Sequence, residues 1–185
     1  MLHALCLLVL CCVAAHAQEA KGDAPDKQTG LVYGKDHVFA VTAPEGWVLD
    51  NKSGVEQGIH AVFYPVGSNW RDSKAVMYVN TAAKPDTLEK FIEGDVAGFR
   101  KDSPGLKVTD DEPLTVAGKE RVIVKRFSDD QYGNHEAVAY VEESKVVVII
   151  VFTARTKKDF EAALPAFRKL VSSYRFISGK VVTGN

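Results

Sequence analysis

The run KVVVIIVFTA at residues 145–154 constrains the fold more than any other segment of the chain. It is apolar at nearly every position, so a strand formed by it has no polar face to turn toward water. Such a strand needs apolar cover on both sides, whereas a sheet covered on one side only would leave part of it exposed. We therefore expect a central strand here, with a helix on each face of its sheet.

Two segments have the apolar periodicity of amphipathic helices that could supply this cover. We expect the first to begin at Asp86, whose carboxylate would cap the helix, with Glu89 three residues further on. The second begins at Thr156, with Asp159 in the equivalent position.

Other segments have the alternation or the short apolar runs typical of strands. We expect a hairpin around Glu143 and Ser144 that joins the run at residues 145–154 to the strand before it. The other expected strands are residues 37–42, 59–64, 74–81, 106–110, 114–116, 120–128 and 135–142.

The start of the chain has the pattern of a secretory signal peptide, residues 1–17. An apolar run at residues 2–13 ends at Ala15-His16-Ala17, and a run of this length is too short to span a bilayer. We expect an exported protein, periplasmic or secreted, with no membrane span in the mature chain. Residues 18–29 and 179–185 are expected to be flexible, on either side of a single domain at residues 30–178.

Composition excludes several classes of function. All three cysteines, Cys6, Cys11 and Cys12, lie in the leader, so the mature chain has no thiol chemistry. Charged residues make up 25% of the chain and its formal net charge is −1, so nucleic acid is not an expected partner. We expect a monomer.

Two stretches, HVFAVTAPEGW at residues 37–47 and FEAALPAFRKLVSSYRF at residues 160–176, resemble the PsbP-like family. That family contains the extrinsic photosystem II subunit P, the Mog-type import factor that binds Ran, and exported bacterial proteins of unknown role, which this chain resembles. The resemblance implies an α+β fold, a three-layer α/β/α sandwich with a central antiparallel sheet. It also implies an accessory or binding role without catalysis.

The sequence offers candidates for binding and none for catalysis. Trp70 and Arg71 lie in a polar loop, where a large aromatic side chain is typical of a recognition site. Alternatively, Trp70 folds back to cap the core. Tyr132 and His135 belong to a turn whose rings could reach the same end of the sheet, although the same residues suit an ordinary hairpin.

Catalytic, metal and cofactor motifs are not evident. The chain has no Gly-x-Ser-x-Gly or Ser-x-x-Lys motif, and its histidines outside the leader, His37, His60 and His135, have no metal-ligand spacing. We therefore expect no cofactor and no metal.

The main hypothesis is a non-enzymatic accessory or binding protein that acts through surface loops on an unknown protein or a small apolar ligand. One alternative is a periplasmic hydrolase-type enzyme in which a histidine meets Asp36 or Asp129 in a cleft. A second alternative is an inhibitor or immunity-type protein.

Overall fold

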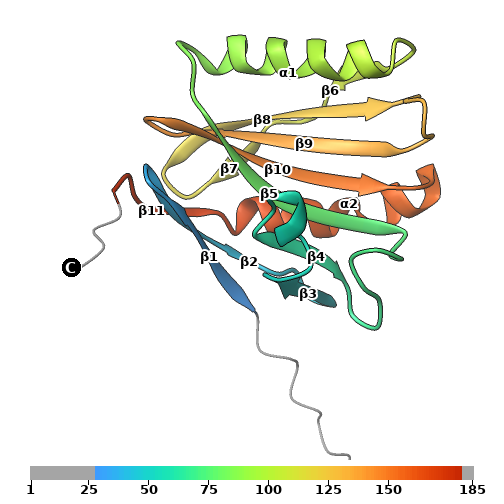
Figure 1. Cartoon of the computed structure of the whole chain (residues 1–185), viewed down its shortest axis with the longest axis horizontal. Helices are drawn as coiled ribbons and strands as arrows, with labels where there is room; N and C mark the ends of the chain where they lie inside the picture. The colour runs from blue at the N-terminus through green and yellow to red at the C-terminus, as the bar shows by residue number, and fades with distance from the viewer. Residues whose placement is uncertain (1–27, 181–185) are drawn as a thin grey trace, which may run out of the picture.

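The computed structural model describes residues 28–180, except for the side chains of residues 119–121. The described chain is an α+β fold with two antiparallel sheets and two α-helices (Figure 1). The expected α+β class with an antiparallel sheet is therefore confirmed. The predicted leader lies outside the described residues.

Within residues 28–180 the larger sheet has eight strands and the smaller sheet has three. All neighbouring strands in both sheets pair in antiparallel fashion. The larger sheet has the order β3 (Trp47–Asp50), β4 (Ala61–Pro65), β5 (Ala75–Ala83), β10 (Val146–Ala154), β9 (His135–Glu142), β8 (Lys119–Ser128) and β6 (Lys107–Asp110), with β7 (Leu114–Val116) also paired to β8. The smaller has the order β1 (Thr29–Gly34), β2 (His37–Thr42) and β11 (Arg175–Ser178).

Strand β10 is the apolar run, and it lies between β5 and β9. Its alternate side chains enter two different apolar clusters. Val148, Ile150 and Phe152 pack with helix α2 (Lys157–Ser172), whereas Val147 and Val151 pack with helix α1 (Leu88–Asp102). We call these clusters the α2 core and the α1 core.

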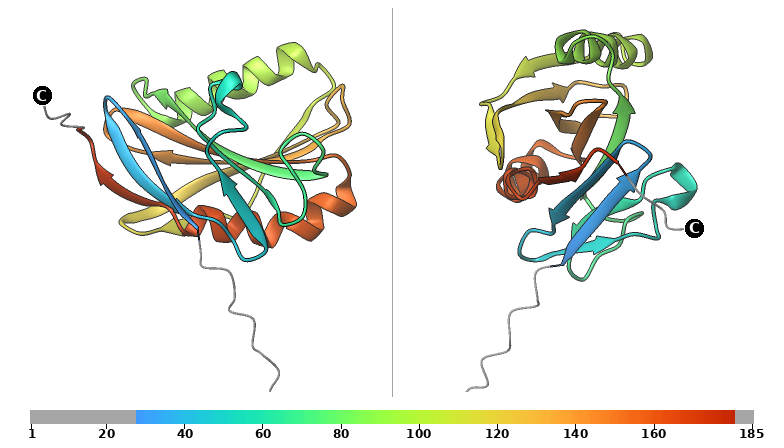
Figure 2. Two further views of the ribbon diagram at one scale, coloured as in Figure 1. Left: turned by 60° about the horizontal axis from the view of Figure 1, so that its bottom comes forward. Right: turned by 90° about the vertical axis from the view of Figure 1, so that its left-hand side faces the viewer.

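The α2 core also joins the two sheets, because Phe39 and Val41 of β2 belong to it. Strand β11 leads from the end of α2 into the smaller sheet (Figure 2). Tyr174, just before β11, is buried, and its ring lies 5.2 Å from that of Phe39. Tyr174 and β11, near the end of the described chain, are thus packed against β2, near its start.

Three strands were not expected from the sequence, namely β1, β3 and β11. β1 begins and ends near glycines and carries exposed Leu31 and Tyr33, so its pattern does not stand out as a strand. β3 has four residues and follows a tight turn, in which Gly46 has a φ of 78°. β11 is equally short, and its register shifts between Phe176 and Ser178.

The helix caps differ from expectation in one case. The cap of α1 is Thr87, whose hydroxyl accepts a hydrogen bond from the Lys90 N–H at 3.2 Å. Asp86, the expected cap, instead pairs with the Lys90 ammonium at 2.6 Å. The predicted cap of α2 is confirmed, because the Thr156 hydroxyl accepts from the Asp159 N–H at 3.1 Å. The expected hairpin is also confirmed, since β9 and β10 pair directly across residues 143–145.

Candidate functional site

One end of the larger sheet gathers several loops. Ala154, at the end of β10, lies opposite both Ala75 and His135. The loop before β5, at residues 66–74, and the turn before β9, at residues 129–134, therefore share this end (Figure 1). The C-terminal end of α1 also lies here, since the Gln131 N–H donates to the Ser103 hydroxyl at 3.3 Å. We call this region the loop end.

A hollow of about 560 Å³ opens at the loop end, between the end of α1 and the turn before β9. We call it the α1 hollow. Its volume falls within the range of small-molecule sites. Apolar, acidic and amide side chains all line it. The lining residues are Phe99, Lys101, Asp102, Ser103, Leu106, Phe127, Asp130, Gln131, Tyr132, Asn134 and Glu136.

Asp130 shapes the turn that forms one wall of the hollow. Its Oδ1 atom accepts hydrogen bonds from the Tyr132 N–H at 3.0 Å and from the Asn134 N–H at 2.8 Å. The turn also uses two left-handed residues, Asp129 with a φ of 60° and Gly133 with a φ of 75°. As a result Tyr132 is held at the rim with 76% of its surface exposed.

Glu136 lies deeper in the hollow, on the same side of β9 as the α1 core. The Thr153 hydroxyl donates to its carboxylate. Burial raises the pKa of Glu136; the Thr153 hydrogen bond opposes this effect, and the negative charges of Asp130 and Asp95 add to it. No cation pairs with Glu136 among the residues that the structure describes.

A second polar group lies behind Glu136, under α1. The Tyr140 hydroxyl donates to the Asp95 carboxylate at 2.6 Å. Burial, this hydrogen bond and the Asp95 charge raise the pKa of Tyr140. Burial, with the charges of Glu136 and Asp95, raises the pKa of Tyr78 to about 12. The two tyrosines are therefore neutral at pH 7, and neither Asp95 nor Glu136 forms an ion pair with a described cation.

The structure separates the four candidate residues of the sequence analysis. Trp70 is half-buried and meets Tyr78 edge to face, with ring centroids 6.1 Å apart. Arg71 is exposed, and its carbonyl accepts from the Arg155 guanidinium at 3.3 Å. Tyr132 lines the α1 hollow, whereas His135 faces α2, its ring 6.1 Å from that of Phe160. Tyr132 and His135 thus share the loop end but line different hollows.

The sequence analysis missed Glu136, Asp95 and Tyr140. Glu136 directly precedes the apolar run at residues 137–141 of β9 and alternates with Val138 and Tyr140, a pattern that could have marked it. Asp95 lies on α1 at a position between Ile92 and Phe99, close to the apolar stripe of that helix. Only the fold brings these residues together.

The three histidines among residues 28–180 lie in or before different strands. His37 is buried in β2, where it stacks on Phe39 with ring centroids 5.7 Å apart. His60 is exposed before β4, and His135 begins β9. No group of three metal-binding side chains forms within the described part of the chain.

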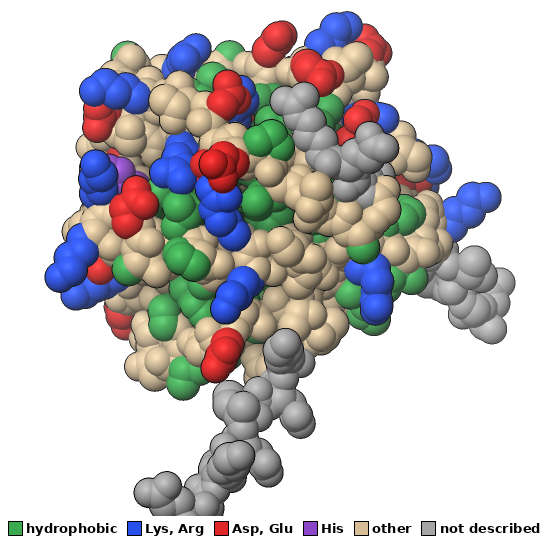
Figure 3. All heavy atoms as spheres, turned by 180° about the vertical axis from the view of Figure 1, so that it is seen from behind, with side chains coloured by type: hydrophobic (Ala, Val, Ile, Leu, Met, Phe, Trp, Pro, Cys, Tyr) green, Lys and Arg blue, Asp and Glu red, His purple; other side chains and the backbone are tan. Residues whose placement is uncertain are grey.

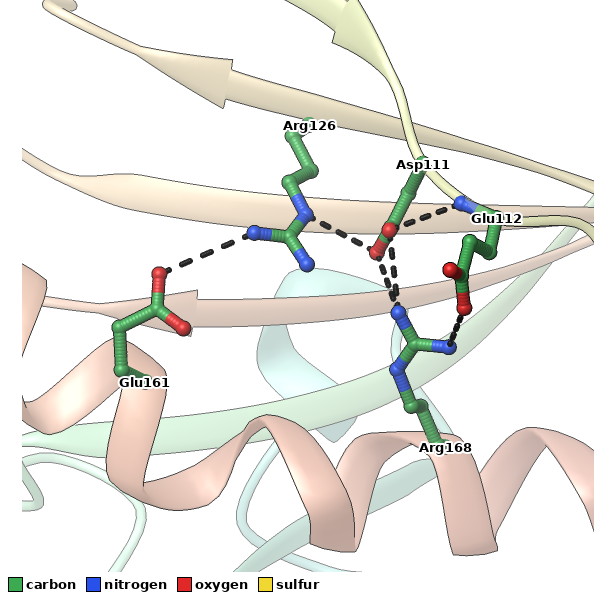
Figure 4. Close-up of polar contacts among 5 residues, drawn as sticks. All are labelled: Asp111, Glu112, Arg126, Glu161 and Arg168. Carbon is green, nitrogen blue, oxygen red and sulfur yellow. Dashed lines mark hydrogen bonds and ion pairs between the residues drawn. The ribbon is translucent and has the colours of Figure 1, made fainter.

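A network of ion pairs fixes the face of α2 to the larger sheet (Figure 4). Asp111, between β6 and β7, pairs with the Arg126 Nε atom at 2.9 Å and with the Arg168 guanidinium at 3.0 Å. Burial raises the pKa of Asp111, but the hydrogen bonds from Arg126 and from the Glu112 N–H, with the charges of Arg126 and Arg168, outweigh it and lower that pKa. Arg126 also lies over the Phe160 ring, at 5.7 Å.

Other basic side chains of the larger sheet and its hairpin are also paired with acidic ones. Lys125 pairs with Asp110 at 2.5 Å, and Lys145 pairs with Asp36 at 2.8 Å. Figure 3 shows acidic and basic side chains interspersed on the face opposite that of Figure 1, with apolar side chains between them. That face has a mixed charge, which does not suit a phosphate backbone.

Comparison with known proteins shows the fold. No protein-family model and no curated protein matches the chain. Among solved structures, cyanobacterial PsbP from Synechocystis sp. PCC 6803 is similar with a TM-score of 0.52 and 11% identity, over 84% of this chain and 96% of that one. The Saccharomyces cerevisiae Ran-binding protein Mog1p is similar with a TM-score of 0.51 and 10% identity, over 83% and 96%. LpqN of Mycobacterium tuberculosis, described as involved in cell envelope biogenesis, is similar with a TM-score of 0.53 and 11% identity, over 82% and 91%.

The chain therefore has the PsbP/Mog1 fold, as its resemblance to that family implied. Neither of the two described helices is both long and apolar enough to cross a bilayer.

Proposed function

We propose that this protein is an exported, non-enzymatic accessory or binding protein that uses its loop end to hold a protein or small-ligand partner. The observation that carries the proposal is the α1 hollow, with Tyr132 at its rim. An aromatic side chain with 76% exposure contributes little to stability, and such residues are enriched where partners bind.

Two further observations support a binding role. The same fold occurs in a protein named as Ran-binding and in one described as involved in envelope biogenesis. In addition, His135 and Asp129 line one hollow, but the Asp129 carboxylate pairs with the Lys107 ammonium at 2.8 Å, which disfavours the hydrolase-type alternative.

The finer architecture belongs to the same proposal. Alternate residues of β10 enter the α1 core and the α2 core, and alternate residues of a strand point to opposite faces. We infer that α1 and α2 cover opposite faces of the larger sheet, as in a three-layer α/β/α sandwich. Such a scaffold would hold the loop end rigid.

Export and a monomeric state rest on the sequence. The pattern at residues 1–17 predicts cleavage after Ala17, and the mature protein would then begin at Gln18. N-terminal sequencing of the protein recovered outside the cytoplasm tests the cleavage, and sedimentation of that protein tests the monomer.

Crosslinking tests the binding role. A photoreactive group placed at Gln131, beside the hollow, should capture a defined partner from the cells that make the protein. Replacing Trp70 and Tyr132 together by alanine should abolish the capture, whereas Tyr33→Ala should not, because Tyr33 is equally exposed but lies on β1. Identical capture by all three proteins would refute a role for the loop end.

A further inference from the structure

The α1 hollow combines three features that favour the same kind of ligand. Its lining includes three carboxylates, those of Asp102, Asp130 and Glu136, against the single ammonium of Lys101. Its wall includes the C-terminal turn of α1, where the helix dipole is negative. Its remaining lining is aromatic or aliphatic at four positions and uncharged polar at three, namely Phe99, Leu106, Phe127, Tyr132, Ser103, Gln131 and Asn134. Negative charge beside apolar rings is complementary to a cation that has an apolar stem.

The three carboxylates differ in what they can offer a ligand. Asp130 already accepts three hydrogen bonds from its own turn, which hold it in place. Glu136 accepts only from Thr153, on its Oε1 atom, and no described group meets its Oε2 atom. Leaving a largely buried carboxylate without a cation is costly, so an incoming cation would relieve this cost.

The aromatic groups lie where they can contact such a cation. Phe99 and Phe127 pack together with ring centroids 5.0 Å apart and form the apolar wall. Tyr132 stands at the rim, and cations bind over aromatic faces. A bare metal ion fits poorly, because the described residues hold no cluster of three ligating side chains and the hollow is much larger than an ion.

We propose that the α1 hollow binds an organic cation, an ammonium or guanidinium group on a short apolar stem, with Glu136 as its counter-ion and Tyr132 over its charge. This inference rests on the proposed binding role and assigns its chemistry. The cation has two possible sources, a free amine and a lysine or arginine side chain of a partner.

Titrations followed by amide NMR shifts test the proposal. Hexylammonium and butylguanidinium should shift the amides of residues 99–103 and 131–136 with saturation. Neutral 1-hexanol and anionic hexanoate should bind at least about tenfold more weakly, since they lack the charge that the carboxylates attract. Equal binding of 1-hexanol and hexylammonium, or shifts that never saturate, would overturn the proposal.

Matched variants locate the site. Glu136→Gln should weaken hexylammonium binding about tenfold or more, whereas Glu56→Gln, the same change on the exposed turn η1 (Val55–Gln57), should leave it unchanged. Tyr132→Ala should weaken binding about two- to fivefold, as expected for one cation–π contact, and Tyr33→Ala should not. Because Tyr132 is exposed, Tyr132→Ala should fold normally. It therefore still tests the site if Glu136→Gln does not fold.

Two peptides distinguish the sources of the cation. Tighter binding of acetyl-Ala-Arg-Ala-amide or acetyl-Ala-Lys-Ala-amide than of the free cations indicates a partner side chain, and the reverse order indicates a small amine. If no cation binds while the Trp70 and Tyr132 substitutions still abolish crosslinking, this inference fails and the binding role stands. If both experiments are negative, both proposals fail.

Discussion

At the scale of single residues, Glu136 shows a conflict between stability and the proposed site. Its native pKa is raised above the ordinary value of 4.5 by burial and by nearby negative charges. Between 4.5 and that raised value the native protein binds more protons than the unfolded chain, so stability falls as pH rises through this window. The full penalty is present above the raised pKa.

Glu136→Gln removes this penalty. We expect the variant to be more stable than the parent protein at pH 7, with the difference disappearing as pH falls to about 4, where the unfolded carboxyl also gains its proton. Urea unfolding at the two pH values measures it. A variant that is less stable at pH 7 would show that the charge of Glu136 has a stabilising partner.

Asp111 has the opposite effect on the pH dependence of stability, because its pKa is lowered in the native protein. Its native pKa is lowered below the ordinary value of 3.8 by Arg126, Arg168 and a backbone N–H, so its contribution is present above about pH 4 and is lost as pH falls through the native value. Asp111→Asn should lower the free energy of unfolding by about 2 kcal/mol at pH 7. The difference in unfolding free energy between Asp111→Asn and the parent protein, measured by urea unfolding, should become smaller at acidic pH.

The control for Asp111 is another aspartate in an ion pair. Asp86 pairs with Lys90, but its side chain is 80% exposed, and pairs of this kind contribute about 0 to 1 kcal/mol. Asp86→Asn should therefore change the unfolding free energy little at either pH. If the two variants lose equal stability at pH 7, the burial of Asp111 has no energetic consequence.

At the scale of elements, the caps of the two helices can be compared. Thr156→Ala and Thr87→Ala each remove a hydroxyl that accepts from a helical N–H, and each should cost about 1 kcal/mol, measured by thermal or urea unfolding. Asp86→Ala should cost much less, since Thr87 and not Asp86 caps α1. If Asp86→Ala lowers the free energy of unfolding more than Thr87→Ala does, Asp86 caps α1, as the sequence predicts.

The caps also illustrate what can be predicted from sequence. Both helices and most strands follow from apolar periodicity, which reports burial directly. The start of α1 was one residue off, because Asp86 and Thr87 are both good caps and only the backbone decides between them. The sequence does not predict β1, β3 and β11, because these strands are short or have exposed apolar residues. They are defined by their pairing with other strands.

The site was less predictable than the fold. Tyr132 could be singled out as an aromatic residue in a polar turn. Its relation to Glu136, Phe99 and Asp102 could not, because α1 and β9 are separated along the chain and meet only through the α1 core. His135 was paired with Tyr132 on sequence distance, but the alternation of β9 turns it toward α2.

At the scale of the whole molecule, the fold depends on its last strand. β2 pairs with β1 on one side and with β11 on the other, so the smaller sheet joins the start of the described chain to its end. Phe176 of β11 is paired with Phe39 and packs against the α2 core. β11 is thus a structural part of the domain, although it has four residues and follows the last helix.

A truncation tests this dependence. Ending the chain after Tyr174 removes β11 and exposes the Phe39 side of the smaller sheet, and should lower the free energy of unfolding by about 2 kcal/mol or more, the contribution of one largely buried aromatic side chain. A chain that ends after Lys180 keeps β11 and should match the full-length protein in urea unfolding. Because Tyr174 and its hydrogen bond to Glu143 at 2.7 Å are present in both truncated chains, the difference between them reports on β11 and the residues that follow it. Equal stability of the two would mean that the larger sheet and its helices hold the domain together unaided.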